Sequence, residues 1–93
     1  MSNVNYFTND NFRVLSYLFD MKGSDNVARI TQQEVADSLK ISRITCNRIF
    51  QALKLREYII PDPLHLGRYT LTNKAIKVVT MFRKSDKNTR KEK

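Results

Sequence analysis

Apolar side chains recur at intervals of three and four residues in four stretches of the chain, which is the spacing of one face of an α-helix. In the first stretch they are Phe12, Leu15, Leu18 and Phe19. Thr8, Asn9 and Asp10 lie just before them and carry the short oxygen-bearing side chains that cap helix N-termini. We therefore expect a flexible lead-in of residues 1–8, followed by a helix that ends near Gly23.

The second and third stretches lie on either side of a short turn. Thr31 and Glu34, in the segment TQQE, have the spacing of a capping box, in which each side chain accepts a hydrogen bond from the other residue's backbone. The buried stripe of this helix is Val35, Ala36 and Leu39. Ser42 then predicts the N-cap of a helix over residues 42–56, whose apolar positions are Cys46, Ile49, Phe50, Leu53 and Leu55.

Two helices joined by a turn of three or four residues are typical of a helix-turn-helix unit. Ala36 is small where the second helix must cross the first, and Ile41 is the apolar residue expected to fill the turn. Lys40 occupies a position where glycine is common, because the turn requires a positive φ. We expect this lysine to cost about 1 kcal/mol relative to glycine.

The remaining elements are short strands and a final helix. Residues 27–30 favour a small strand, and residues 58–60 and 68–72 favour two strands joined by a loop in which Pro61 and Pro63 stop the first. Thr72 is positioned to cap a last helix with Ala75, Ile76, Val79 and Phe82 along one side. The predicted fold is mainly α with a small β-hairpin, in the order α-β-α-α-β-β-α. Its domain spans residues 9–82 and precedes a disordered basic tail of residues 83–93.

The charge of the chain limits the classes of partner that it is expected to bind. Seventeen Lys and Arg against nine Asp and Glu give a net charge of +8, and the segment of residues 40–56 holds five basic residues and no acidic one. An excess of this kind favours polyanions, either nucleic acid or an acidic membrane surface. Basic chains that bind neither also exist, so the charge leaves the choice open.

The helix of residues 42–56 provides the candidate base-reading side chains. If Cys46 and Ile49 point inward, four residues point outward: Arg43, Ile44, Asn47 and Arg48. Arginine can make two hydrogen bonds to guanine and asparagine two to adenine, while Ile44 could meet a thymine methyl group. We expect phosphate contacts from Thr31, Ser42 and Thr45, and from Arg68 in a wing of residues 59–71. His65 is interpreted as a surface loop residue.

The segment from Ile30 to Ile59, with the pattern Ser-Arg-x-Thr-x-x-Arg at residues 42–48, resembles the DNA-binding part of the catabolite activator protein family. The resemblance covers residues 29–82 and implies a winged helix-turn-helix fold. It implies that Arg43 and Arg48 contact guanine and that the Ser42 and Thr45 hydroxyls contact phosphate. Ile44 departs from the acidic residue common in that family, so the base sequence read is left open.

Other classes of function find little support in the sequence. The single His and single Cys form no pair on a predicted face, and only two glycines are present, so we expect no enzyme, no metal site and no cofactor. Cys46 is interpreted as a small core residue rather than a redox sensor. No apolar run approaches the length of a membrane span, no signal peptide is recognisable, and a cytoplasmic protein without a small-molecule effector is expected.

Three hypotheses remain from the sequence. The first is a sequence-specific double-stranded DNA-binding regulator of transcription. The second is the DNA-binding module of a plasmid or phage replication or partition system, and the third is a winged-helix protein-interaction domain with no nucleic-acid role. A homodimer is expected, through Tyr6, Phe7 and the apolar side of the last helix, although those residues could equally be packed internally.

Overall fold

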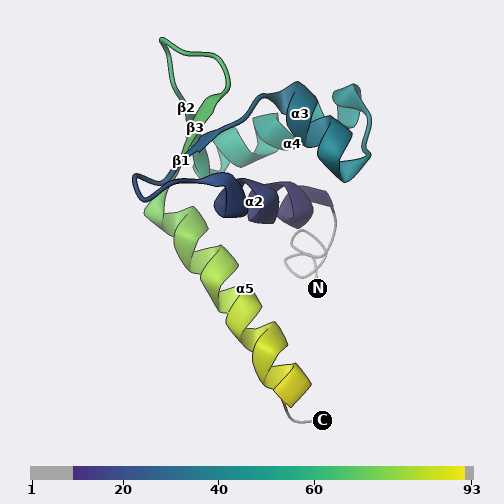
Figure 1. Cartoon of the computed structure of the whole chain (residues 1–93), viewed down its shortest axis with the longest axis vertical. Coiled ribbons are helices and arrows are strands. Elements are labelled where there is room, and N and C mark those ends of the chain that lie inside the picture. Colours follow the sequence, from purple (N-terminus) through teal and green to yellow (C-terminus); the bar gives the residue numbers. More distant parts are fainter. Residues whose placement is uncertain (1–9, 92–93) are drawn as a thin grey trace.

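The computed structural model of the chain describes the backbone of residues 10–91 and the side chains of residues 10–84. Its elements are α2 (Asp10–Met21), β1 (Val27–Arg29), α3 (Gln32–Leu39), α4 (Arg43–Leu55), β2 (Ile59–Pro61), β3 (Arg68–Leu71) and α5 (Asn73–Lys91) (Figure 1). The predicted order α-β-α-α-β-β-α is confirmed, and the fold is a winged helix. The predicted lead-in of residues 1–8 lies outside the described residues, as do Tyr6 and Phe7.

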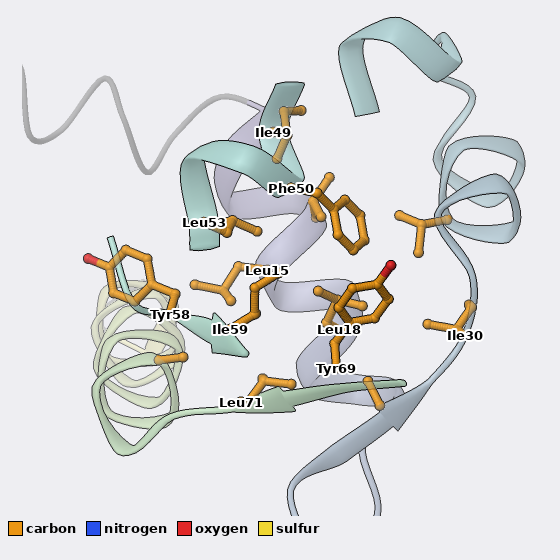
Figure 2. Close-up of a cluster of buried hydrophobic side chains, with 14 of the residues drawn as sticks. Leu15, Leu18, Ile30, Ile49, Phe50, Leu53, Tyr58, Ile59, Tyr69 and Leu71 are labelled. Carbon is orange, nitrogen blue, oxygen red and sulfur yellow. The ribbon is translucent and has the colours of Figure 1, made fainter. Parts of the chain in front are cut away.

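The core forms where α2, α4 and the sheet meet. Val14, Leu15 and Leu18 of α2 are fully buried and face Phe50 and Leu53 of α4. Figure 2 shows the Phe50 ring beside Tyr69 of β3, and the ring centroids are 4.9 Å apart in an edge-to-face arrangement. Each fully buried side chain of this size contributes about 1.5–3 kcal/mol. This packing sets the orientation of α4.

The three strands form one antiparallel sheet in the order β1-β3-β2. Ala28 is opposite Tyr69 on one side of β3, and Pro61 is opposite Tyr69 on the other. The sequence predicted a hairpin and a separate short strand, and the pairing of β1 with β3 adds that strand to the hairpin. The wing is thereby attached to the segment that leads into α3.

The start of α3 and the turn between α3 and α4 have the predicted helix caps and backbone conformation. Thr31 and Glu34 form the capping box, with Thr31 N donating to Glu34 Oε1 at 2.9 Å and Glu34 N donating to Thr31 Oγ1 at 3.1 Å. Lys40 has φ 59°, the left-handed conformation expected there, and the following N–H of Ile41 donates to the Ala36 carbonyl at 3.0 Å. Ser42 caps α4 by accepting from Thr45 N at 3.0 Å.

The C-terminal end of α4 is bound to the start of α5. The Thr72 hydroxyl donates to the Glu57 carbonyl at 2.7 Å and accepts from Ala75 N at 3.2 Å, so it caps α5 as predicted. Lys74 Nζ donates to the Arg56 carbonyl at 2.8 Å and lies over the Tyr58 ring. One prediction at this end of α4 is wrong, because Leu55 is 84% exposed rather than buried. It is the last residue of α4, beyond the last buried turn.

The predicted end of the last helix is also wrong. α5 continues through Lys91, nine residues past Phe82, into the part of residues 83–93 that was expected to be disordered. Arg83 explains the first step of this extension: its guanidinium donates to Ser16 Oγ at 2.6 Å and pairs with Asp20 at 2.9 Å. The residues that follow include no glycine or proline, so no strong helix breaker interrupts an established helix through Lys91.

Candidate nucleic-acid interface

The two faces of α4 are separated as the sequence predicted. Cys46 and Ile49 are 1% and 5% exposed, and they pack inward. The four predicted base-reading residues are all exposed on the other side: Arg43, Ile44, Asn47 and Arg48. Ile44 is 74% exposed. The first half of α4 therefore presents two cations, an amide and an apolar side chain to one side.

The hydroxyls at the start of α4 are held by each other. Ser42 Oγ donates to Thr45 Oγ1 at 2.9 Å while it accepts from Thr45 N. The Thr31 hydroxyl is occupied in the capping box of α3. Of these three predicted phosphate contacts, Ser42 and Thr31 are N-caps that donate their O–H within the protein. Thr45 accepts from Ser42, so its own O–H can be donated to a phosphate oxygen.

A groove of about 710 Å³ lies between the starts of α3 and α4. Its lining residues are Gln32, Gln33, Ser42, Arg43, Ile44 and Asn47. Asn47 Nδ2 donates to Gln32 Oε1 across this groove at 3.2 Å. Sequence reasoning missed both glutamines, because their closeness to α4 depends on the angle between two helices. Their position in the first turn of α3, beside a capping box, was the signal available.

The base of the wing carries two arginines on one face. Arg68 of β3 is directly opposite Arg29 of β1, so the two side chains leave the same face of the sheet. Arg29 pairs with Asp25 at 2.7 Å, and this hydrogen bond from the guanidinium is the main cause that lowers the pKa of the Asp25 carboxyl. Arg29 is a further residue that the sequence did not indicate, since the pairing of β1 with β3 brings it beside Arg68.

Gly67 connects the wing to the helix-turn-helix unit. It has φ 77°, and a Cβ built on it would be 3.1 Å from Thr31 Cγ2. The end of the wing loop therefore lies against the N-cap of α3, which is one residue from Gln32 of the groove. The wing, α3 and the start of α4 form a continuous surface.

The tip of the wing is apolar. Leu64 is 84% exposed and Leu66 is 100% exposed. Asp62 shapes this tip by accepting a hydrogen bond from Leu64 N at 2.8 Å, which is the first cause that lowers the pKa of its carboxyl, and by contacting His65 at 3.4 Å. His65 lies on the surface of the loop, as expected.

Cys46 has the environment of a core residue. Its thiol donates to the Gln32 carbonyl at 3.5 Å, and burial raises the pKa of the thiol. A neutral buried thiol is a poor nucleophile. The structure thus gives Cys46 a packing role between α4 and α3.

Two further features of the described residues concern metal binding and membranes. No group of three or more His, Cys, Asp or Glu side chains that could hold a metal ion occurs within them. None of the described helices is long and apolar enough to cross a membrane.

Comparisons with known proteins agree with the fold. A family profile described as winged helix-turn-helix DNA-binding matches residues 27–60. A solved structure of a mutant of S. aureus MepR is similar over 98% of this chain and 68% of that one, with 21% identity and a TM-score of 0.75. A crystal structure of an S. aureus MepR–DNA complex is similar over 98% and 66%, with 20% identity and a TM-score of 0.69. No curated protein sequence matches.

These findings define a winged helix-turn-helix domain. The matching solved structures are of MepR, whereas the sequence motif had suggested the catabolite activator protein family. The resemblance to that family is therefore supported at the level of the domain type. The chain spans about two thirds of each MepR chain it matches.

Proposed function

We propose that this chain is a sequence-specific double-stranded DNA-binding protein that regulates transcription. The observation that carries the proposal is the exposed first half of α4, which presents Arg43, Ile44, Asn47 and Arg48 on a helix whose opposite face is buried. An exposed helix of this kind fits the major groove, where arginine can read guanine and asparagine adenine. The net charge of +8 adds general attraction to DNA.

The phosphate contacts in this proposal flank α4. Ser42 and Thr45 lie at its N-terminus, where the helix dipole favours an anion, and Thr31 lies across the groove at the start of α3. Arg68 extends the row to the wing, with Arg29 beside it. The S. aureus MepR–DNA complex, a similar fold bound to DNA, supports this use of the surface.

We further propose that two copies bind together, because a single α4 reads a short site and two half-sites one helical turn apart double it. The apolar side of α5 contributes less to a dimer than the sequence suggested. Val79 is fully buried within the chain and Phe82 packs on Phe12 at 5.0 Å, so both are used internally. Met81, which is 66% exposed, is left on the outer side of α5.

One observation favours a second function. The exposed Leu64 and Leu66 at the wing tip are side chains of the kind that protein interfaces cover. A protein-interaction winged helix without a nucleic-acid role would use them, and its affinity for DNA would be absent even at low salt. A replication or partition module would present the same DNA-binding surface as a regulator.

The test is selection of bound DNA from a random pool, with wild type and two variants. Wild type is expected to select one consensus, and a palindromic consensus would support the dimer. Arg43→Ala is expected to lose about 1–3 kcal/mol of discrimination at one base pair while it still folds. Lys77→Ala removes the same charge from the exposed side of α5 and should keep the preference. Equal selection by wild type and Arg43→Ala would contradict the reading role of α4.

A further inference from the structure

The hydrogen bond between Asn47 and Gln32 joins two helices across the candidate interface. Asn47 Nδ2 donates to Gln32 Oε1 at 3.2 Å. The backbone of Gln32 is anchored, because its carbonyl accepts from Cys46 Sγ at 3.5 Å and it is the first residue of α3, inside the capping box of Thr31 and Glu34. The glutamine is half-buried, whereas Asn47 is exposed. A partly buried, anchored acceptor thus holds an exposed amide.

The consequence depends on what an asparagine amide can offer to a base. It carries two N–H donors and one carbonyl acceptor. Recognition of adenine uses one donor, toward N7, and the acceptor, toward the N6 amino group. Gln32 uses one of the two N–H groups of Asn47, so one donor and the carbonyl oxygen remain. Those are the two groups that adenine requires.

Holding the amide also couples its orientation to that of the Gln32 amide. A free asparagine on a helix surface rotates about χ2 and exchanges the positions of its oxygen and nitrogen, which would present the opposite pattern to a base. With Gln32 Oε1 facing Asn47, the bond holds the Asn47 nitrogen toward α3, and the reverse arrangement requires both amides to turn over together. It also removes rotational freedom before DNA arrives, which lowers the entropic cost of binding.

We propose that Gln32 is a positioning residue that makes Asn47 selective for adenine. This inference rests on the proposed function, since it concerns the specificity of the same site. Gln33 supplies a comparison within the structure. It lines the same groove, but its amide donates to Asp37 of its own helix at 3.0 Å.

The experiment measures base preference at every position of the selected DNA site. Asn47→Ala first identifies the adenine that depends on Asn47. Gln32→Met keeps the length of the side chain and removes the acceptor, and we expect it to reduce the preference for that adenine by about tenfold, with other positions unchanged. Gln32→Glu retains an acceptor oxygen, so it should keep the preference while its negative charge lowers overall affinity. Thr80→Met places the same side chain on the exposed side of α5, outside the groove, and should behave as wild type.

The outcomes separate the inference from the proposed function. A wild-type chain that selects no DNA sequence overturns both. A chain that selects a sequence, and whose Gln32→Met variant keeps full preference for the Asn47-dependent adenine, overturns only the role of Gln32. Loss of preference at a different position also overturns it, since Gln32 would then contact a base itself. Loss in Gln32→Met with retention in Gln32→Glu supports the inference, because a general structural defect would not be repaired by glutamate.

Discussion

The candidate interface has two parts that are built in different ways. The helix part, α3 with the first half of α4, lies directly on the core, and its side chains are connected by caps and by the Gln32–Asn47 bond. The wing consists of strands of three and four residues, and its tip exposes Leu64 and Leu66. The geometry of the helix part follows from packing, whereas that of the wing depends on a few local bonds.

This difference suggests a division of labour. Reading a base requires donors and acceptors placed to within a fraction of an ångström, which a helix held by Cys46, Ile49 and Phe50 provides. Contact with the DNA backbone tolerates more variation, so a wing attached through Gly67 and the β1–β3 pairing is sufficient for it. Changes in the wing should therefore alter affinity, and changes in α4 should alter preference.

The largest effect on the wing is expected from Gly67→Ala. Alanine at φ 77° is strained, and its Cβ would press on Thr31 Cγ2 at 3.1 Å, so we expect a loss of about 1–2 kcal/mol of stability. Chemical denaturation measures this loss, and DNA binding should weaken without a change in consensus. Gly23→Ala is the control, because Gly23 does not have a positive φ and its new Cβ would meet only the end of the flexible Asp25 side chain, 3.2 Å from Oδ1, and Arg29 Nη1 at 3.7 Å. A change of consensus in Gly67→Ala would contradict the separation of the two parts.

A smaller change in stability, this time an increase, is expected in the helix part from Lys40→Gly. Lys40 has φ 59°, so glycine should relieve about 1 kcal/mol of strain and raise the free energy of unfolding. Lys40→Ala keeps a Cβ at the same φ and should stay close to wild type. Comparing the unfolding free energies of the two variants by denaturation isolates the effect of backbone strain. If the glycine variant is no more stable than the alanine variant, Lys40 is not strained by its positive φ.

Arg68→Ala tests the backbone role of the wing. Removal of one phosphate contact should reduce the slope of the logarithm of affinity against the logarithm of salt concentration by about 1, with base preference retained. Arg68→Lys keeps the charge and should keep the slope. If wild type, Arg68→Ala and Arg68→Lys all have the same slope, Arg68 does not contact phosphate.

The smallest effect is expected from acid at the wing tip. Hydrogen bonding by Leu64 N, followed by His65, lowers the pKa of Asp62. The contribution of this carboxylate to wing order is therefore complete above the unfolded pKa of about 3.9, and it is lost as the pH falls through the lower folded value. The NMR shift of the Leu64 amide proton should report the loss. Asp62→Asn should show no such titration, and an identical titration in that variant would exclude Asp62 as its cause.

Local signals in the sequence were sufficient for most of the helix part. The capping box at Thr31 and Glu34, the Ser42 cap and the positive φ of Lys40 all depend on residues close together in the chain, and the structure confirms each one. The inward direction of Cys46 and Ile49 follows from helical periodicity in the same way. The outward direction of the base-reading candidates then required no further information.

Features that depend on distant residues could not be predicted. The Gln32–Asn47 bond needs the angle between α3 and α4, and the position of Arg29 needs the pairing of β1 with β3. The extension of α5 past Phe82 depends on contacts of Arg83 with α2, 67 residues away in the case of Ser16. A decline in apolar residues marked the end of the core correctly but did not mark the end of the helix.

The bonds between the end of α4 and the start of α5 have a mechanical consequence. Thr72 and Lys74 hold the Glu57 and Arg56 carbonyls, so the two helices are connected where one ends and the other begins. α5 extends from this joint away from the wing (Figure 1), as a helix of 19 residues. Because Arg83 also bonds to Ser16 and Asp20 of α2, α5 is braced at two points along its length, and a force on its far end would be carried by α2 as well as by this joint.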